Sequence, residues 1–391
     1  MSEKSEKEYR FATKAIHSGQ DPDPSTGAVI GPIYATSTYA QETPGQFKGF
    51  DYSRTANPTR QSLEECMADL EGGSKAFAFA SGMAATATVL ELLDSGDHII
   101  SMDDLYGGTY RLFENVRKRS SNLDFSFVDL SNIENLKENL KPKTKMIWVE
   151  SPSNPLLKVV DLKRVSAFAR ENNLLCVCDN TFCSPFVQRP LDLGFDIVVH
   201  SATKYLNGHS DVVGGVAICS HDNIELGERL GFLSNSVGSI MGPFDSFLVL
   251  RSLKTLSLRM KQHCQSASDI ARFLDAHGSI DKVYYPGLPG HVNHEVAASQ
   301  MNGFGGMISV VVKGGLESAT RFLENTRLFT LAESLGGVES LIEHPAIMTH
   351  ASVPQEIRER LGIVDGLVRL SVGIEAIEDL MGDLEHALSF C

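Results

Sequence analysis

Short apolar segments alternate with amphipathic segments through the first half of the chain, and this alternation constrains the fold more than any other feature. The apolar segments predict strands at residues 76–80, 98–102, 125–128, 146–150, 174–179 and 196–200. Helices are predicted after Thr59, at 83–93 and at 162–171. Several strands are apolar throughout, as strands buried on both faces are. Such a chain forms a mostly parallel α/β sheet with helices on both faces.

The length of 391 residues predicts two domains preceded by an arm. Residues 1–55 lack a convincing periodicity and contain many prolines and glycines, so we expect an arm that lies on a neighbouring subunit. Residues 56–250 would form the sheet domain, and residues 251–391 a smaller C-terminal domain. The elements expected near and in that domain are a long helical stretch at 243–274, strands at 307–313 and 368–372, and a helix at 376–390.

Composition excludes several classes of partner. The formal net charge of −14 argues against a nucleic acid as the main partner. The first ten residues are charged, and no apolar run approaches the ~20 residues needed to span a bilayer, so we expect neither a signal peptide nor a membrane partner. The seven cysteines are scattered and form no C-x-x-C motif, which indicates reduced thiols in a cytoplasmic protein.

The segment around Lys204 carries the strongest chemical signal. A strand ends near residue 200, and Ser201, Thr203 and Lys204 follow at once. The carboxyl ends of strands in an open parallel sheet are where ligands bind. A lysine placed there can form a Schiff base with an aldehyde, and the two hydroxyls can hold a phosphate. Pyridoxal 5'-phosphate (PLP) carries both groups. Taken alone, Lys204 could equally be a solvated surface lysine.

Three further segments offer what PLP needs. Asp179 closes the preceding strand, where a carboxylate could face the pyridine nitrogen. Gly82 and Met83 lie where a strand turns into a helix, and the unpaired N–H groups of a helix start bind phosphate. Tyr106 follows another strand and could stack on the ring. Each has a plain alternative, respectively a turn-capping aspartate, a tight turn and a half-buried loop tyrosine.

Rival motifs do not fit. The segment around Ser81 lacks the glycine two residues before the serine that a nucleophile elbow requires. The glycines at 303–306 precede their strand and have the wrong spacing for a dinucleotide site. His291 and His294 lie among turn-forming residues, so we expect a loop there and no metal site.

Together, these motifs resemble the PLP-dependent enzymes of transsulfuration, the cystathionine γ-lyase and cystathionine γ-synthase family. The matching segments cover nearly the whole chain and are residues 52–54, 57–60, 80–86, 103–109, 179–182, 201–211, 332–337, 348–352 and 369–373. The resemblance implies fold type I, that of aspartate aminotransferase. In this fold a large domain with a mostly parallel sheet is followed by a smaller α+β domain at the C-terminus.

The resemblance also implies how the cofactor is held. The implied cofactor-binding residues are Lys204, Asp179, Gly82, Met83, Ser201, Thr203, Tyr106, Tyr52 and Arg54. Lys204 and Tyr106 would also be catalytic. Tyr52 and Arg54 would reach the phosphate of the neighbouring subunit's cofactor. This implies a homo-oligomer with active sites shared across a dimer, and the family suggests a homotetramer.

Four residues are implied to bind an amino-acid substrate. Arg369 would bind the α-carboxylate with Asn154 and Ser334, and Glu333 would attract a distal ammonium group. Arg369 suits this role on chemical grounds as well. A guanidinium matches a carboxylate with two parallel hydrogen bonds, and an arginine within an apolar strand needs an anionic partner. The alternative is a structural ion pair.

The resemblance favours a carbon–sulfur lyase, and cystathionine γ-lyase above its neighbours. Glu333 is typical of members whose substrates carry a distal amino group, and Gly108 stands where the methionine γ-lyase branch has cysteine. Cystathionine β-lyase and cystathionine γ-synthase, which joins an O-acylhomoserine to cysteine, remain alternatives. A PLP-fold protein that has lost catalysis and serves as a binding subunit is a more remote one.

Overall fold

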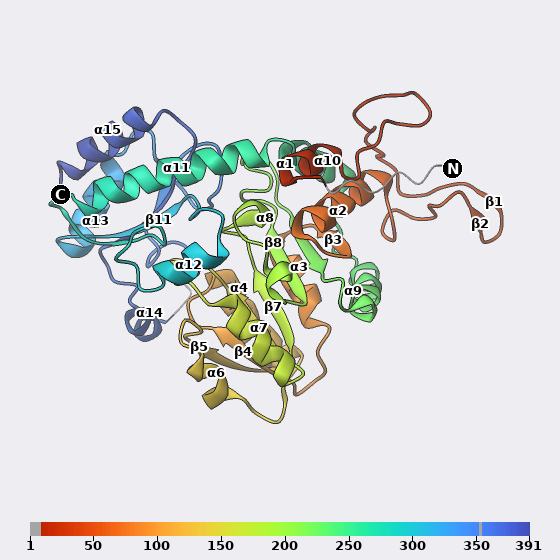
Figure 1. The fold of residues 1–391 in the computed structure, drawn as a ribbon, viewed down its shortest axis with the longest axis horizontal. Helices are drawn as coiled ribbons and strands as arrows, with labels where there is room; N and C mark the ends of the chain where they lie inside the picture. Colours follow the sequence, from red (N-terminus) through yellow and green to blue (C-terminus); the bar gives the residue numbers. More distant parts are fainter. Residues whose placement is uncertain (1–8, 352–353) are drawn as a thin grey trace.

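Two β-sheets organise the chain in the computed structural model, which describes residues 9–351 and 354–391 (Figure 1). Residues 1–8 of the predicted arm and Ser352 of one matching segment lie outside the described residues. The larger sheet has seven strands in the order β3-β9-β8-β7-β6-β4-β5. Within this sheet β9 alone is reversed, and the other six strands run in one direction. The predicted α/β class with a mostly parallel sheet is therefore confirmed.

Six strands of the large sheet have bounds within two residues of the predicted ones. The bounds of the sheet's strands are β3 Lys75–Phe79, β4 His98–Met102, β5 Asp124–Val128, β6 Thr144–Glu150, β7 Leu175–Asp179, β8 Ile197–Ser201 and β9 Gly215–Cys219. The reversed strand β9 was not predicted. Because the remaining strands share one direction, the carboxyl ends of β3, β4, β6, β7 and β8 meet at one edge of the sheet.

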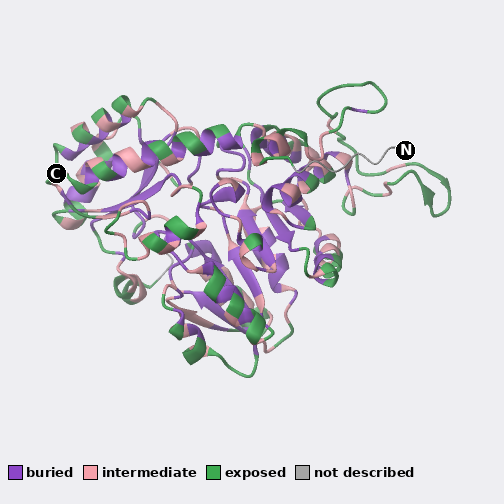
Figure 2. Ribbon diagram, viewed as in Figure 1, coloured by how far each residue is buried: buried purple, intermediate pink, exposed green. Residues whose placement is uncertain are grey.

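Helices cover both faces of this sheet, as the apolar strands predicted. Alternate strand residues face opposite ways, so Ile147 of β6 packs with one set of helices and Trp148 with the other. One face packs against α2 (Pro58–Glu71) and α7 (Leu162–Glu171). The other packs against α3 (Gly82–Leu90), the π-helix at Leu112–Arg117 and α9 (Ile224–Val237). Figure 2 shows the buried sheet between the exposed outer faces of these helices.

The smaller sheet has five strands in the order β10-β11-β14-β13-β12. Their bounds are β10 Ile280–Tyr284, β11 Met307–Val312, β12 Thr330–Leu331, β13 Leu341–Glu343 and β14 Leu367–Ser371. Three helices pack on it through a separate apolar cluster: α11 (Leu256–Asp275), α13 (Gly315–Asn325) and α15 (Ile377–Leu388). This is the smaller α+β part that the family resemblance implied.

Several short helices lie in the connections. They are α4 Gly107–Arg111, α5 Lys118–Ser120, α6 Glu134–Asn139, α8 Ser184–Val187, the 3-10 helix Pro190–Leu193, α12 His294–Gln300 and α14 Gln355–Leu361. The expectation of a loop at the histidine pair was wrong in part, because α12 starts at His294. The rings of His291 and His294 each lie within hydrogen-bonding distance of a backbone carbonyl.

The long helical stretch predicted at 243–274 is divided into α10 (Pro243–Leu253) and α11. The helix stops at Lys254 and Thr255, where the Thr255 backbone leaves the helical region. The guanidinium of Arg259 binds the carbonyl of Ser252 across the break. The predicted division at residue 250 falls within α10, and the limits of the two domains stay a prediction.

Most of the predicted arm extends away from the body of the chain and is exposed, but its first helix packs against α2 and α11 (Figures 1 and 2). It contains a short hairpin of β1 (Gln41–Thr43) and β2 (Gln46–Phe47) and a helix that was not predicted, α1 (Phe11–His17). Only Ala15 of α1 is buried, so the helix gives little periodic signal in the sequence. No helix among residues 9–351 and 354–391 has the length and apolar character to cross a membrane.

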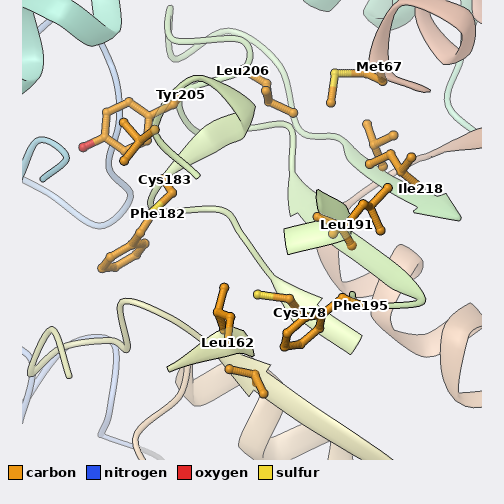
Figure 3. Close-up of a cluster of buried hydrophobic side chains, with 14 of the residues drawn as sticks. Met67, Leu162, Cys178, Phe182, Cys183, Leu191, Phe195, Tyr205, Leu206 and Ile218 are labelled. Carbon is orange, nitrogen blue, oxygen red and sulfur yellow. The ribbon is translucent and has the colours of Figure 1, made fainter. Parts of the chain in front are cut away.

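A buried apolar cluster fixes the segments that follow β7 and β8 (Figure 3). Tyr205 and Leu206, directly after Lys204, are each about 1% exposed. Phe182 and Cys183, which follow Asp179, belong to the same cluster. Burial of each large apolar side chain contributes roughly 1.5–3 kcal/mol. The predicted cofactor residues at 179 and 204 are thus held by apolar neighbours on their own segments.

Candidate active site

A cavity of about 280 Å³ lies at the edge of the large sheet where the strand ends meet. All of the predicted site residues line it except Tyr52 and Arg54: Gly82, Met83, Tyr106, Asn154, Asp179, Ser201, Thr203, Lys204, Glu333, Ser334 and Arg369. Arg369 lies on β14, and Glu333 and Ser334 follow β12, so both sheets contribute. The structure therefore brings together residues that are up to 287 positions apart in the chain, from Gly82 to Arg369.

Lys204 directs its amine across the cavity toward the second sheet. Its Nζ donates a hydrogen bond of 2.6 Å to Ser334 Oγ. Burial and the neighbouring Arg369 charge lower the pKa of Lys204 from 10.5 to about 8, against the opposing charges of Glu343 and Glu333. A large part of this amine is therefore neutral in mildly alkaline solution, as a proton acceptor must be.

Ser334 joins the lysine to the arginine. Its hydroxyl accepts from Lys204, and its carbonyl oxygen accepts a hydrogen bond of 2.9 Å from Arg369 Nη2. The Ser334 backbone has φ +95°, a region that side-chain-bearing residues rarely adopt and that costs about 1–3 kcal/mol. This local cost is offset by two hydrogen bonds that set where the amine and the guanidinium lie.

Arg369 is almost fully buried, with 2% of its surface exposed. Its Nη1 donates a hydrogen bond of 2.9 Å to Asn154 Oδ1 and lies 3.0 Å from Glu343 Oε1. The predicted alternative of a structural ion pair is thus partly correct, because Arg369 has a carboxylate partner within the chain. The guanidinium still lines the cavity and can meet an anion there.

Asp179 is held at the end of β7 by a neighbour that the sequence analysis missed. Its Oδ1 accepts hydrogen bonds from Thr181 N at 3.0 Å and Thr181 Oγ1 at 2.6 Å. Thr181 Oγ1 in turn accepts from Ser201 N at 2.9 Å, which ties β7 to β8. Burial raises the pKa of Asp179, while the Thr181 bonds and the nearby His200 oppose that rise. The carboxylate is thus fixed in direction and partly stabilised in its charged form.

The start of α3 forms one wall of the cavity. Ser81 caps the helix by accepting a hydrogen bond of 3.0 Å from Ala84 N. The N–H groups of Gly82 and Met83 have no partner within the helix, as is usual for the first turn. A Cβ atom at Gly82 would lie 2.9 Å from Ser201 Cβ, closer than real contacts allow. Only glycine lets the helix start and the end of β8 approach this closely.

Tyr106 precedes α4 and is anchored through its backbone. Its N–H donates a hydrogen bond of 3.0 Å to Glu150 Oε2, which closes β6. A Cβ atom at Gly108 would lie 2.4 Å from Tyr106 Cε1. In the sequence, Gly108 distinguished this chain from the methionine γ-lyase branch. In the structure, its lack of a side chain also leaves room for the Tyr106 ring.

Two acidic residues, one at the cavity and one behind its wall, were missed for different reasons. Glu150 lies beside Asp179 in the paired strands, and its burial, with the Asp179 charge, raises its pKa well above the usual value. It closes an apolar strand as Asp179 does, so the same signal could have found it. Glu71, the last residue of α2, lies 2.5 Å from His200 Nε2, and Asn180 donates to the same oxygen. Only the tertiary structure brings these residues together.

Tyr52 and Arg54 do not reach the cavity of their own chain. Both are exposed, and the Arg54 guanidinium lies 5.5 Å from the centre of the Tyr52 ring. Arg54 Nε donates a hydrogen bond of 3.2 Å to Asn235 on α9. A role at a cofactor therefore requires a second copy of the chain.

The residues at the cavity fit PLP. The cavity offers an amine of lowered pKa for the aldehyde, a half-buried carboxyl at the end of β7 for the pyridine nitrogen, and a helix start for the phosphate. A side chain at Gly82 would clash with Ser201, so glycine keeps the helix start and the end of β8 close together on the phosphate side of the cavity. Tyr106 supplies an aromatic ring at the same wall.

Comparisons with known proteins agree with this chemistry. The model of the family described as "Cys/Met metabolism PLP-dependent enzyme" matches residues 12–389. The chain is 61% identical to cystathionine β-lyase of Coxiella burnetii over 99% of its own length and 100% of that protein. It is 52% identical to cystathionine γ-lyase of Bacillus subtilis, over 96% and 98% of the two chains.

A solved structure has the same fold. Cystathionine γ-lyase from Lactobacillus plantarum, complexed with L-serine, superimposes with a TM-score of 0.95 at 47% sequence identity. The superposition covers 97% of this chain and 99% of that chain.

Substitution of Gly82 tests the close approach between α3 and β8. We expect Gly82→Ala to weaken PLP binding at least about tenfold, equivalent to about 1.4 kcal/mol, because the new methyl group must displace Ser201. Titration of the cofactor-free protein with PLP, followed by absorbance, measures the dissociation constant. Gly382→Ala is the matched control, since no atom lies within 4 Å of its added Cβ. Equal affinities in the two variants would contradict the assigned phosphate wall.

Proposed function

Since the chain belongs to the PLP-dependent enzymes of Cys and Met metabolism and is a carbon–sulfur lyase, we propose that its substrate is L-cystathionine. We propose γ-elimination as the main reaction, with L-cysteine, 2-oxobutyrate and ammonia as the products. The observation that carries the proposal is that Lys204, Arg369 and Glu333 line one cavity. A substrate with two amino and two carboxylate groups can use all three: a base for its Cα proton, a cation for its α-carboxylate and an anionic side chain for its distal ammonium.

Arg369 and Glu333 would orient the substrate between them. The guanidinium takes the α-carboxylate of the reacting half, with Asn154 and Ser334 holding the arginine in place. Glu333 is exposed at the cavity and would attract the ammonium group of the other half. Binding at both ends places the carbons between them beside the Lys204 amine, which is the proximity that catalysis needs.

The chain's own residues would hold PLP at the cavity wall. Lys204 would bind its aldehyde, Asp179 its pyridine nitrogen, and Gly82, Met83, Ser201 and Thr203 its phosphate, with Tyr106 against the ring. When bound, PLP withdraws electrons from the substrate's Cα and so makes the Cα–H acidic. The phosphate site would be completed by Tyr52 and Arg54 of a second copy, which makes a dimer the smallest active unit.

Lys204 is the group placed to move protons. Once the substrate's amine has replaced it at the aldehyde, the Lys204 amine would be free, and with a pKa of about 8 a much larger fraction of it is neutral, and so able to accept a proton, than of an ordinary lysine at the same pH. β-Elimination requires the removal of one proton, that on Cα. γ-Elimination requires the removal of the Cα proton and of a second proton, from Cβ. The Ser334 hydroxyl lies 2.6 Å from Nζ and offers a second site through which a proton can pass. This arrangement supports γ-elimination.

β-Elimination is the second candidate, favoured by the name of the Coxiella burnetii relative at 61% identity. It would give pyruvate, ammonia and homocysteine. Glu333 cannot separate the two reactions, because the distal ammonium of cystathionine lies the same number of bonds from the reacting Cα in either orientation. The choice depends on which half of the substrate occupies Arg369 and on whether the Cβ proton can be removed.

The product of cystathionine cleavage tests the proposal. We expect the PLP-loaded protein to form 2-oxobutyrate and cysteine in larger amounts than pyruvate and homocysteine, measured by chromatography of the keto acids and thiols. Pyruvate as the main keto acid would replace γ-elimination by β-elimination. Faster cystathionine synthesis from an O-acylhomoserine and cysteine would indicate a synthase. No turnover of any of these substrates would favour a non-catalytic binding subunit.

Removal of the Glu333 charge tests the substrate assignment. We expect Glu333→Gln to lower kcat/KM for cystathionine about tenfold, a loss of about 1.4 kcal/mol, and to change kcat/KM for cysteine less than twofold. The reason is that cysteine has no distal ammonium for the carboxylate to attract. The control is Glu378→Gln, which removes a charge from an exposed position on α15. An equal loss for both substrates would remove Glu333 from substrate recognition.

A further inference from the structure

Arg369 already has an anionic partner inside the protein. Glu343 of β13 lies directly opposite Arg369 of β14 in the strand register, and Glu343 Oε1 is 3.0 Å from Arg369 Nη1. Their side chains are 1% and 3% exposed. A charge pair this well buried is shielded little by water, so each charge depends on the other. The proposed receptor for the substrate carboxylate is therefore electrically neutralised before any substrate arrives.

Glu343 has one oxygen paired and one oxygen free. Oε1 accepts a hydrogen bond of 2.9 Å from Thr349 Oγ1 as well as facing Arg369. Oε2 is buried and has no hydrogen-bond partner among the described residues. Burial, with a smaller effect of Glu333, raises the pKa of Glu343, and Arg369, Thr349 and Lys204 oppose the rise. The free oxygen is a place where a proton can be held.

The other groups around the pair limit which of them can exchange a proton. The ring of His350, after β13, lies 2.9 Å from Thr349 Oγ1, and burial lowers its pKa to about 4, so it is neutral near pH 7. Glu150 of β6 also faces Arg369, and its burial raises its pKa well above the usual value. Glu333 and Lys204 face the pair from the cavity. Glu343 is the carboxyl in direct contact with the guanidinium.

A substrate carboxylate at Arg369 would be the second anion on one guanidinium. Two carboxylates that share a site of low dielectric repel each other, and one of them retains a proton. The substrate carboxylate is the more acidic of the two and stays ionised. The response that costs the least free energy is therefore for Glu343 to take up a proton from solvent on its unpaired Oε2.

We propose that Glu343 is a built-in counter-anion for Arg369 and takes up a proton when a substrate carboxylate binds there, an inference that rests on the proposed function of Arg369. Without substrate, the ionised Glu343 pairs with Arg369, so the guanidinium charge is not buried without a partner. With substrate, it becomes neutral and leaves the guanidinium to the ligand. Glu343 is in this sense a positioning residue, since it acts on the substrate through Arg369.

The sign of the pH dependence follows directly. Binding that takes up a proton is favoured at low pH and weakens as pH rises. Where Glu343 is ionised in the free protein and neutral in the complex, this contribution changes the affinity about tenfold per pH unit. Replacing Glu343 by glutamine removes the contribution, so the ratio of the variant's affinity to that of the wild type should rise with pH.

Calorimetry counts this proton without measuring activity. L-Alanine is the probe because it has the α-carboxylate and amine but no leaving group. The PLP-loaded protein is titrated at pH 8 in two buffers of different ionisation enthalpy, and the difference in heat gives the protons taken up. We expect wild type to take up about one proton more per site than Glu343→Gln. Glu343→Asp, which keeps a carboxyl, and Glu378→Gln, on the exposed face of α15, should resemble wild type.

Equal proton uptake by wild type and Glu343→Gln would overturn the inference. If Glu343→Gln does not fold, Thr349→Val gives a second test. Loss of the Thr349 hydrogen bond raises the pKa of Glu343 further, so the extra uptake should begin at a higher pH than in wild type. An unchanged onset would also overturn the inference. Failure of the proposed function has a different signature, since alanine would then give no binding heat even with wild type.

Discussion

The hydrogen bonds of Ser334 to Lys204 and Arg369 join the two sheets at the cavity. The amine comes from the end of β8 and the guanidinium from β14, and neither sheet alone contains both groups. Ser334 adopts a backbone conformation that is unfavourable for serine, which identifies its placement as a constraint set by the site. Ser334 thus contacts both the proton-moving group and the carboxylate receptor.

Charge balance is the second constraint on the cavity. Two cationic side chains, Lys204 and Arg369, face the carboxyls of Asp179, Glu150 and Glu343. Burial raises the pKa of each of these carboxyls and lowers that of Lys204. The same desolvation that would destabilise unpaired charges thus brings an amine into the range where it can gain and lose protons. The carbon–sulfur lyase chemistry of the family needs this property.

Much of this arrangement could be predicted from the sequence, because local patterns encode it. The helix at 162–171 and the strand at 98–102 were predicted residue for residue, and Lys204, Asp179 and Gly82 were found from their places at strand ends. The contacts of Glu71 and Glu343 could not be predicted, since each looks like an ordinary acidic residue until a distant strand is paired with it. The break between α10 and α11 and the start of α12 at His294 were not predicted either. Residues beside both bind distant backbone carbonyls, Arg259 that of Tyr205 and Asn293 that of Val159, and such contacts can outweigh local propensity.

The covalent attachment of PLP to Lys204 is the most direct test of the central claim that the cavity is built around this amine. The protein is loaded with PLP, reduced with borohydride and digested, and the labelled peptide is identified by mass spectrometry. The label is predicted on Lys204 alone, with none recovered from a Lys204→Ala variant that still folds. A label on another lysine, or a wild-type protein that takes no label after incubation with PLP, would contradict it.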